Sequence, residues 1–592
     1  PVAHHAMAGP AELFVERPVE IAGKLIAVAS SMRLLEASAN AHSIADYSTL
    51  CGVPEDVIVG LAREFTAHGK KAAVTTHGGT MAANGFQSAF ALITLNTLVG
   101  NLNRKGGTFV GAGGFNPLAG PRYKLDSFDG EVKFAGTPLS RNVPYERTTE
   151  FKTKKAAGKP YPAEAPWFST AGQLSTEWLP AALQGYPYGL DALILWSCNP
   201  VYGIAGVREI AKRTLGDPKT IPLLIAVDPF INESSAYADY IVPDSTMYES
   251  WGYAAPWAFI PTKSMMARWP VVEPKNARTA EGQPINVESF LIALGKALGL
   301  PGFGENALSG ADGQKYPLNT AEDWWLRAGA NVAFTGKAPV GDASDDDLAL
   351  SGVSRIWREI REILPEAEAR KVAFLYTRGG RHQPAKEAWE ENGKHAWAFA
   401  KPLQIWNEAI GTSRDSMTGK RNSGVPGWAA PRFADGAPLE ARYPAKDWPF
   451  KLISQKSPLQ NSYSMTHRRL RGLHPDNPVG MNPEDARRLG VASGDKIRIE
   501  TPNGAAEASI VVRRSVRQGV LAVEHGFGHR ELGARSHRIG DKTQPRDPGA
   551  GAGLALNELG LVDPTRKSAA VLLDPISGTS VRQGLPARVA RA

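Results

Sequence analysis

Three short apolar segments, each followed by a polar turn, constrain the fold of this chain more than any other feature. Residues 192–196 and 223–227 contain no charged or polar side chain, and residues 240–242 follow closely. A helix is predicted between the first two segments, over about residues 207–215. Buried strands joined by helices are typical of a parallel sheet with right-handed crossovers, so we expect an α/β fold.

The same order of strand, turn and helix is predicted nearer the N-terminus. Residues 71–76 have the composition of a short buried strand, a glycine-containing turn follows, and residues 86–99 are predicted to be an apolar helix. An amphipathic helix is expected before them, over residues 46–65. One more strand is predicted at residues 371–376. These segments extend the expected α/β arrangement over much of the chain.

From Lys451 onward the pattern changes to short strands joined by tight turns. Strands are predicted at residues 495–500, 506–512 and 519–524, with a Pro-Asn-Gly turn between the first two. A two-turn helix with a polar N-cap and a C-terminal glycine is predicted over residues 483–489. These features predict a C-terminal β-barrel.

A chain of 592 residues exceeds the size at which one hydrophobic core stops growing, so several domains are expected. We predict an α/β domain over residues 1–265, with a long loop-like insertion at 118–190. A second α/β portion with a Pro-rich linker is predicted over residues 266–445, and residues 306–347 within it are expected to be surface loop. The barrel domain is predicted over residues 446–592.

The net charge of +8 raises nucleic acid as a possible partner, but the distribution of charge argues against it. From Lys451 to the end there are 22 Lys and Arg against 13 Asp and Glu, whereas the rest of the chain is nearly neutral. A buried anionic nucleotide in the last domain would explain this excess, and so would a well-solvated surface. We therefore predict no nucleic-acid partner.

The two cysteines, Cys51 and Cys198, exclude a disulfide framework, and neither belongs to a Cys-x-x-Cys pair. We expect Cys51 to be a small buried apolar residue and Cys198 to be structural. No metal ligand and no ligand set for an iron–sulfur cluster is predicted in this chain. There is no run of about 20 apolar residues to span a bilayer. Because the chain begins at Pro1 without an initiator Met or a signal segment, its natural N-terminal portion is expected to be missing.

Ligands of an open parallel sheet bind at the carboxyl ends of the strands, where turns converge and helix N-termini attract anions. The candidate binding loops are therefore residues 77–85, 197–203, 228–235 and 378–382. None of them matches the Gly-x-Gly-x-x-Gly pattern or the P-loop, so neither a Rossmann NAD site nor an NTPase is supported.

Single residues in these loops have both a structural and a functional interpretation. Gly78 and Gly79 can let the backbone approach a flat ligand, or can serve an ordinary turn, and Asn84 offers a donor near them. Asn199 can present its amide to a phosphate or can cap the following helix. Asp228 can accept two hydrogen bonds from a guanine edge or a ribose, or can be a cap.

Taken in order, the motifs of the chain resemble those of the dimethyl sulfoxide reductase superfamily of molybdenum enzymes. The resemblance spans nearly the whole chain. In the last domain, residues 482–486, 489–490, 494–497, 525–529 and 557–559 resemble the molybdopterin dinucleotide-binding barrel of that family. Before it, the matching motifs are His77-Gly78-Gly79-Thr80-Met81, residues 95–101 with 105–107, Trp196-Ser197-Cys198-Asn199-Pro200, Val227-Asp228-Pro229-Phe230, and residues 238–243 with 248–252.

The resemblance implies parallel-sheet dinucleotide-binding domains followed by a β-barrel of the double-psi type. It also implies a molybdenum bis(molybdopterin guanine dinucleotide) cofactor. In physical terms, amides and hydroxyls can hydrogen-bond a pterin edge, and a lysine can neutralise a diphosphate. The implied cofactor contacts are His77, Gly78, Gly79, Asn84, Asn199, Asp228, Lys456, Ser457, His467, His525, Gly526 and Asn557. If this is right, His77, Asn199, Asp228, Lys456 and His525 should converge on one cleft.

Within the superfamily, the chain looks most like the branch that holds the catalytic subunits of tetrathionate reductase and respiratory arsenate reductase. The implied function is two-electron reduction of a small anionic oxidant by the C-terminal part of a respiratory catalytic subunit, with tetrathionate reduced to thiosulfate as the preferred reaction. Reduction of arsenate, thiosulfate or polysulfide is the alternative within the superfamily. A non-catalytic, cofactor-binding scaffold subunit is the alternative from another class.

The resemblance also implies a [4Fe–4S] cluster, held by the missing N-terminal portion of the same polypeptide. Implied partners are that portion, a membrane-anchor subunit, and an iron–sulfur electron-transfer subunit. The implied location is periplasmic, with membrane association through these partners, although this chain carries no export signal.

Arg378, Arg381 and His382 follow the strand predicted at residues 371–376. Their positive charge can form a funnel that attracts a dianionic oxidant. The alternative is that both arginines pair with local carboxylates.

Overall fold

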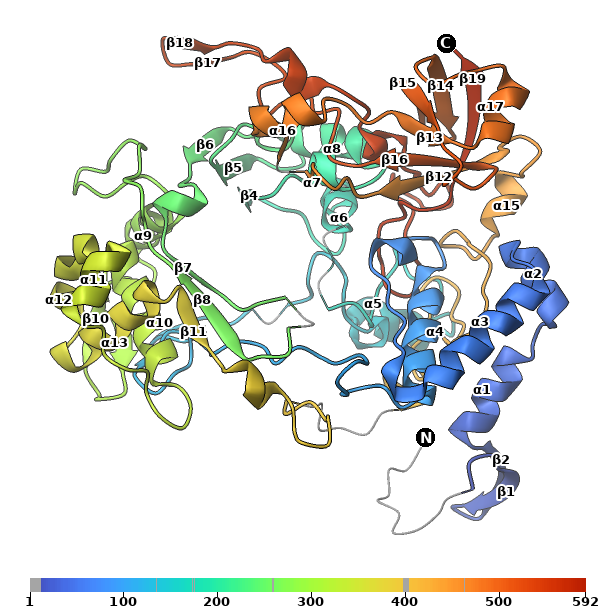
Figure 1. The fold of residues 1–592 in the computed structure, drawn as a ribbon, viewed down its shortest axis with the longest axis horizontal. Helices are drawn as coiled ribbons and strands as arrows, with labels where there is room; N and C mark the ends of the chain where they lie inside the picture. Colours follow the sequence, from blue (N-terminus) through green and yellow to red (C-terminus); the bar gives the residue numbers. More distant parts are fainter. Residues whose placement is uncertain are drawn as a thin grey trace.

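The computed structural model describes residues 12–134, 136–172, 174, 176–257, 260–397, 404–462 and 464–592. A small parallel sheet and a β-barrel lie next to each other, a helical region with an antiparallel sheet lies on one side of them, and the N-terminal helices lie on the other (Figure 1). No helix within the described ranges is both long enough and apolar enough to cross a bilayer.

The predicted parallel sheet is present. β4 (Ala192–Trp196), β5 (Leu223–Asp228) and β6 (Tyr240–Pro243) run parallel, with β5 in the centre. α6 (Trp178–Gln184) and α8 (Arg208–Leu215) share one buried apolar core with β4 and β5. Because β4 and β5 are parallel neighbours, the turns that follow them lie at the same edge of the sheet.

The C-terminal region forms the predicted β-barrel, which is closed and has six strands. Its core is mostly aliphatic and includes the fully buried Leu452 and Ile497. α17 (Pro483–Leu489) begins at the N-cap Asn482 and ends at Gly490 in the left-handed conformation, as predicted. In order around the barrel, the strands are β12 (Phe450–Gln455), β16 (Val520–Glu524), β13 (Val479–Met481), β15 (Gly504–Val512), β14 (Lys496–Thr501) and β19 (Leu585–Arg591).

The third region combines an antiparallel sheet with a cluster of helices. The sheet contains β7 (Gly252–Ala254), β8 (Ser264–Arg268) and β11 (Gly380–His382). α10 (Ala321–Phe334) and α13 (Glu366–Thr377) bury their faces in one common core. The helices of this region are α9 (Val287–Ala297), α10 (Ala321–Phe334), α11 (Asp345–Ser351), α12 (Trp357–Ile363) and α13 (Glu366–Thr377).

The strand predicted at residues 371–376 is wrong, because this segment lies inside α13. The apolar run also has helical spacing: Ala369, Val372, Ala373 and Tyr376 are all buried. These positions repeat every three to four residues and so form one face of a helix. A short apolar run cannot be assigned to strand or helix from its composition alone.

The loop predicted at residues 306–347 is also wrong. It contains much of β9 (Gly304–Gly310), β10 (Lys315–Leu318), α10 and the start of α11. α10 begins with a capping box between Thr320 and Asp323, a signal that was present in the sequence. Burial of Leu326 and Val332 then stabilises the helix through tertiary packing.

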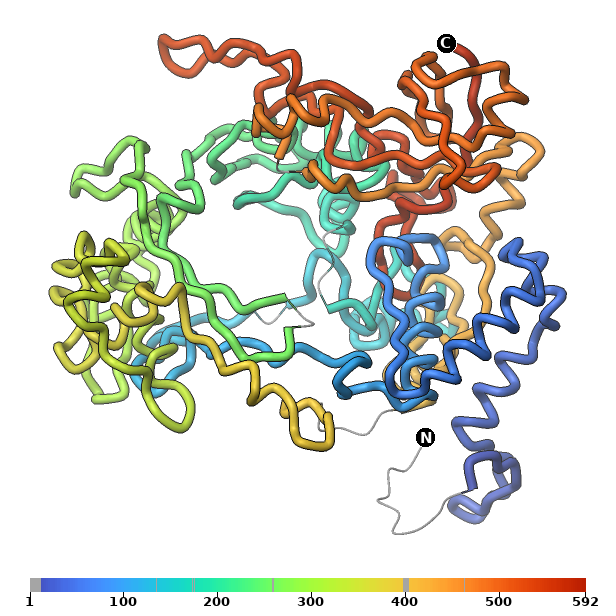
Figure 2. The backbone as a smooth tube through the Cα atoms, in the orientation of Figure 1, coloured from blue at the N-terminus to red at the C-terminus, as the bar shows by residue number. Residues whose placement is uncertain are grey.

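Residues 118–190 are mostly irregular, as expected of an insertion, although they include short elements. The hairpin of β17 (His537–Ile539) and β18 (Lys542–Gln544) projects away from the barrel region (Figure 2). The remaining short elements are β3 (Tyr123–Lys124), α5 (Thr149–Ala156), α7 (Pro200–Gly203), α14 (Glu408–Gly411), α15 (Leu439–Arg442) and α16 (Arg468–Leu473).

The N-terminal part differs from prediction in three respects. The helix predicted at residues 46–65 is two helices, because Gly52 adopts a left-handed conformation and ends the first. Cys51 is exposed rather than buried, since that first helix buries none of its residues. The elements here are β1 (Glu16–Ile21), β2 (Lys24–Ala29), α1 (Ser31–Ala39), α2 (Ile44–Cys51), α3 (Glu55–His68) and α4 (Gly85–Leu98).

The strand predicted at residues 71–76 is the third difference, since this segment forms no strand. Its backbone bonds to a side chain instead of to a neighbouring strand. The Val74 N–H donates to Oδ1 of Asn96 at 3.1 Å, and Nδ2 of Asn96 donates to the Val74 carbonyl at 2.6 Å. Asn96 of α4 thus takes the place that a strand partner would have.

Candidate functional site

A cavity of about 250 Å³ lies where the turns after β4 and β5 meet the C-terminal region. Its volume approaches the lower end of the range for small-molecule sites. The turns contribute Ser197, Cys198, Asn199, Tyr202, Gly203, Asp228, Phe230 and Asn232, and the C-terminal region contributes Ser454, Ser462, Thr466, His525, Gly526, Leu532, Leu556, Asn557 and Arg582.

Asp228, the last residue of β5, gives the cavity a carboxylate. Its two oxygens accept hydrogen bonds at 2.9 Å from the Phe230 N–H and from Nδ2 of Asn232. Burial, reinforced by the nearby charge of Asp244, raises the pKa of the Asp228 carboxyl. Each oxygen keeps a further lone pair, so Asp228 can cap its own turn and still accept hydrogen bonds from a ligand.

Asn199 uses its side chain within the protein. Its Oδ1 accepts from the Tyr202 N–H, which makes Asn199 the N-cap of α7. The same oxygen accepts from the hydroxyl of Ser234 at 2.9 Å, and Nδ2 donates to Glu233 at 2.6 Å. The capping interpretation therefore describes the geometry, while a phosphate contact by Asn199 stays a prediction.

The residues on the barrel side of the cavity are closely packed. Asn557 donates from Nδ2 to the carbonyls of Tyr202 and Gly203, at 2.8 and 3.2 Å, and so joins this side to α7. Gly526 has φ of 99°, and a Cβ there would lie 2.8 Å from the backbone of Asn461. A side chain at position 526 would therefore collide with the cavity wall.

The C-terminal side of the cavity also carries positive charge. His525 lines it, with Nδ1 3.3 Å from the Ser454 hydroxyl. Burial lowers the pKa of the His525 imidazole, and the positive charges of Arg582 and Lys456 lower it further. Lys456 is exposed and does not line the cavity, but it lies close enough to act on His525. The two ends of the cavity thus differ in charge.

Sequence reasoning missed Arg582, which lines the cavity from the segment before β19. It lies outside the motifs of the barrel, between Gly578 and Gly584, so no pattern singled it out. Its Nη2 donates to the Gly203 carbonyl at 2.5 Å, and its backbone N–H donates to the Met81 carbonyl at 2.8 Å. Arg582 therefore connects the N-terminal turn, α7 and the barrel domain.

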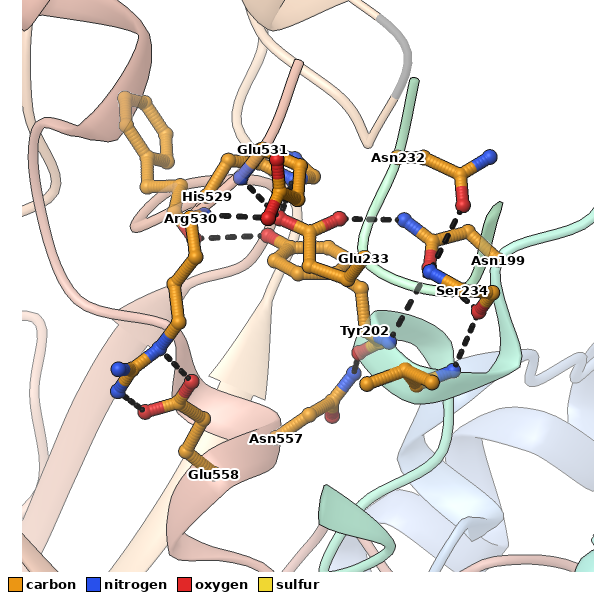
Figure 3. A network of polar contacts seen from close by, with 12 residues as sticks. Asn199, Tyr202, Asn232, Glu233, Ser234, His529, Arg530, Glu531, Asn557 and Glu558 are labelled. Carbon is orange, nitrogen blue, oxygen red and sulfur yellow. Dashed lines mark hydrogen bonds and ion pairs between the residues drawn. The ribbon is translucent and has the colours of Figure 1, made fainter. Parts of the chain in front are cut away.

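A buried ion pair holds the C-terminal domain against the turns of the parallel sheet (Figure 3). His529 Nδ1 lies 3.0 Å from Oε1 of Glu233, and the Arg530 N–H donates to the same oxygen at 2.8 Å. Burial by itself raises the pKa of Glu233, but the bonds from His529, Asn199 and Arg530 together lower it to about 2. The carboxylate is therefore ionised across the physiological range.

Two further contacts support this ion pair (Figure 3). The ring of Tyr202 stacks on that of His529, with centroids 3.8 Å apart. Arg530 makes two hydrogen bonds of 2.7 Å to Glu558, one from Nε and one from Nη2. We call Tyr202, Glu233, His529, Arg530 and Glu558 the domain clamp. Its histidine was within a quoted motif, but no sequence signal linked it to Glu233.

The other predicted contacts lie outside the residues that line this cavity. His77 is exposed and meets Trp257 edge-on at 6.3 Å, while Asn84 donates from Nδ2 to the Ala429 carbonyl at 2.8 Å. Ser457 accepts from the backbone of its own turn, and His467 is the N-cap of α16. Of the five residues expected to converge, Asn199, Asp228 and His525 line the cavity and His77 and Lys456 do not.

Gly78 and Gly79 begin the 3-10 turn that links to the cavity through Gln583. Gln583 Nε2 donates to the carbonyl of Gly78 at 3.2 Å and to that of Ser454 at 2.9 Å. This side chain holds the N-terminal turn against β12. The glycine turn is therefore fixed next to the cavity, although its residues do not line it.

The arginines of the predicted funnel are engaged locally. Arg378 pairs with Asp347 at 2.9 Å, as the alternative interpretation expected. Arg381 instead donates to the carbonyls of Val332, Ala333 and Ala338 around the end of α10. The exposed His382 lies beside Arg381 in β11. A funnel role for these three residues stays a prediction.

The polar groups around the cavity fit a dinucleotide better than a metal ion. Within the described ranges, no group of three or more His, Cys, Asp and Glu side chains is arranged to hold a metal. Burial raises the pKa of the Cys198 thiol, which disfavours the thiolate that metals prefer. A carboxylate near one end and an arginine near the other instead suit a molecule with donors at one end and phosphates at the other.

Residues 450–557 match the family model of the molydopterin dinucleotide binding domain, which covers most of the barrel. The match shows that this chain contains a molybdopterin dinucleotide-binding domain. The chain is a homologue of the A subunits of tetrathionate reductases and of the molybdopterin-containing subunit of an arsenate respiratory reductase, in agreement with the resemblance to the dimethyl sulfoxide reductase superfamily.

The chain is 48% identical to the A subunit of tetrathionate reductase from Salmonella typhimurium over 98% of its own length and 57% of that relative. It is 31% identical to the corresponding protein of Archaeoglobus fulgidus over 88% of its length, and 30% identical to the A subunit of selenate reductase from Mesobacillus selenatarsenatis over 96%. These alignments cover 48% and 55% of those two relatives, so the chain spans about half the length of the curated relatives it matches.

Among solved structures, acetylene hydratase from Pelobacter acetylenicus is similar with a TM-score of 0.51, over 93% of this chain and 65% of that one. The sequence identity is 16%, so this similarity concerns the fold alone.

Proposed function

We propose that this chain is the C-terminal part of the catalytic subunit of a molybdenum-dependent respiratory reductase. The observation that carries the proposal is the position of the cavity, at the junction of the parallel-sheet turns and the domain matched as dinucleotide-binding. Two relatives named as tetrathionate reductases, one from a bacterium and one from an archaeon, support the same conclusion.

The cavity is proposed to hold the guanine nucleotide of a bis(molybdopterin guanine dinucleotide) cofactor. Asp228 would accept hydrogen bonds from the donors on the guanine edge, and Lys456 would neutralise a phosphate nearer the cavity mouth. His77, Gly78, Gly79 and Asn84 would contact the part of the cofactor beyond the cavity. When bound, the molybdenum centre supplies the two-electron chemistry, while the protein supplies binding, orientation and electrostatics.

The proposed reaction is reduction of tetrathionate to two thiosulfate ions. Two electrons break the central sulfur–sulfur bond, and each half leaves as a dianion. Names of the relatives support this substrate ahead of selenate, arsenate or thiosulfate, while polysulfide is the remaining alternative. Arg378, Arg381 and His382 are proposed to attract the dianion by long-range electrostatics, which salt would weaken.

Electrons are proposed to come from an iron–sulfur electron-transfer subunit that is coupled to a membrane-anchor subunit, in the periplasm. A [4Fe–4S] cluster would be held by polypeptide that precedes Pro1, because such a cluster needs four ligands and Cys51 and Cys198 lie far apart in sequence. The rival from another class is a scaffold subunit that binds cofactor without turnover.

A measurement of reductase activity distinguishes the catalytic subunit from the scaffold subunit. The chain should be produced with and without the polypeptide that its longer relatives have in addition, in a host that makes the cofactor. We expect viologen-linked tetrathionate reduction and molybdenum content to appear together when that polypeptide is present. Cofactor binding without turnover of tetrathionate, selenate, arsenate, thiosulfate or polysulfide in the longer protein would favour the scaffold.

A further inference from the structure

Arg582 is the sole arginine or lysine among the described residues that line the cavity. Its Nη2 donates to the Gly203 carbonyl, and its Nε is buried without a hydrogen-bond partner. No carboxylate of the described residues lies within ion-pair distance of it. A mostly buried guanidinium with a carbonyl as its protein partner is thus left without a counter-ion.

Such a charge is costly unless something compensates for it. A buried cation usually pairs with a carboxylate, because removal from water is otherwise unfavourable. Accordingly, burial lowers the pKa of Arg582, whereas the exposed Arg530 beside Glu558 has a raised pKa. Since no described carboxylate pairs with Arg582 and its Nε has no hydrogen-bond partner, an anionic ligand in the cavity would supply the missing counter-ion.

The position of Arg582 is fixed by the residues around it. Its own N–H and that of Gln583 both donate to the Met81 carbonyl, at 2.8 and 3.0 Å. The Gln583 side chain accepts from the Ser454 N–H at 3.0 Å and donates to the carbonyls of Ser454 and Gly78. The backbone of Arg582 is therefore fixed, and the bond from Nη2 to the Gly203 carbonyl orients the guanidinium before any ligand arrives, which reduces the ordering cost of binding.

We propose that Arg582 binds the diphosphate of the dinucleotide and supplies its main positive charge within the cavity. Asp228 lies at the sheet end of the cavity, and Arg582 lies with His525 on the C-terminal side. A guanine nucleotide would thus bind with its base toward Asp228 and its phosphates toward Arg582. The inference rests on the proposed cofactor, and it further ties the glycine turn at Gly78 to phosphate binding through Gln583.

The test is equilibrium binding of GDP and of guanosine to the 592-residue chain, with the Arg582→Gln variant beside the wild type. We expect the variant to bind GDP at least tenfold more weakly, because a charge-assisted hydrogen bond is lost, and to bind guanosine as the wild type does. Arg582→Lys should recover part of the GDP affinity as a point charge. Arg591→Gln, exposed at the end of β19, is the control and should not differ.

Equal GDP affinity in wild type and Arg582→Gln would overturn the role of Arg582 and leave the nucleotide site in place. Failure of the wild type to bind either GDP or guanosine would overturn the proposed function with it. If Arg582→Gln unfolds, the salt dependence of ligand binding by the wild type tests the inference instead. The affinity for GDP should fall as the salt concentration rises, whereas the affinity for guanosine should not change. The same salt dependence for both ligands would contradict the inference.

Discussion

At the scale of single residues, Asp228 combines a structural with a functional role. Its carboxylate closes its own turn through Phe230 and Asn232, yet it also lines the cavity. The sequence offered both interpretations without a reason to choose. Asn199 was equally open, and only its contacts with Tyr202, Glu233 and Ser234 show that its side chain is used within the protein.

Replacement of Asp228 by Asn should weaken GDP binding by roughly 1–3 kcal/mol, because donors on the guanine edge would face an amide in place of a carboxylate. ADP binding should be little changed. Titration calorimetry with both nucleotides measures this, with Asp191→Asn, just before β4 at the opposite end of the sheet, as control. Unaltered GDP affinity would remove the role assigned to Asp228.

The raised pKa of Asp228 adds a dependence on pH. Because the ionised form accepts the hydrogen bonds, GDP affinity should fall as pH drops through this raised pKa, and so at higher pH than for an ordinary aspartate. Binding measured from pH 7 to pH 4 checks this. The fall should be absent in Asp228→Asn.

At the scale of elements, the sequence predicted strands well where a run of apolar residues ended in a polar turn. β4, β5 and β6 lie where they were expected, although Trp196 and Tyr240 stay exposed on this sheet. The strand predicted at residues 371–376 was wrong because the same composition also suits the buried face of a helix. Contacts between distant elements, such as the domain clamp, could not be predicted, because no local pattern encodes a partner about 300 residues away.

The domain clamp should contribute measurably to stability. Glu233→Gln leaves His529 without its buried carboxylate, at a cost of about 3 kcal/mol. Glu500→Gln, which breaks pairs with the exposed Arg498 and Arg588, should cost much less, because solvent screens these exposed charges. Thermal unfolding compares the variants. A Glu233→Gln variant as stable as Glu500→Gln would show that the ion pair does not hold the domains together.

The domain clamp also predicts that the folded chain loses stability at acidic pH. The folded pKa of Glu233, about 2, lies below the ordinary glutamate value of 4.5. Its contribution to stability is therefore complete above pH 4.5 and is lost as pH falls from there toward 2. Unfolding midpoints measured in this window should drop less in Glu233→Gln than in the wild type.

Arg381 and Arg378, two of the residues proposed to attract the substrate, differ in their contacts and can be compared by mutation. Arg381→Ala removes three hydrogen bonds to carbonyls and should destabilise the chain by about 2 kcal/mol, whereas Arg378→Ala removes an exposed, solvent-screened ion pair and should destabilise it much less. Chemical denaturation measures both. In the active enzyme, an Arg381→Ala variant that keeps the salt dependence of the wild type would end the funnel proposal.

At the scale of the whole molecule, the N-terminal hairpin and helices expose apolar side chains that globular proteins usually cover. α1, α2 and α3 bury none of their residues, and Leu25 and Leu61 are 77% and 65% exposed. We expect the chain alone to self-associate and to bind a hydrophobic dye. Light scattering should report less association for Leu25→Ser and Leu61→Ser, and a monomer that binds no dye would contradict this.

Cofactor analysis of the protein produced together with the polypeptide that its longer relatives have in addition tests the central claim most directly. After acid release, we expect molybdenum, pterin and GMP, with two guanine nucleotides for each metal. The GMP content should fall in Asp228→Asn and Arg582→Gln and should be unchanged in Arg591→Gln. Protein that folds, fills with metal and releases no GMP would contradict the assignment of this cavity to a guanine dinucleotide.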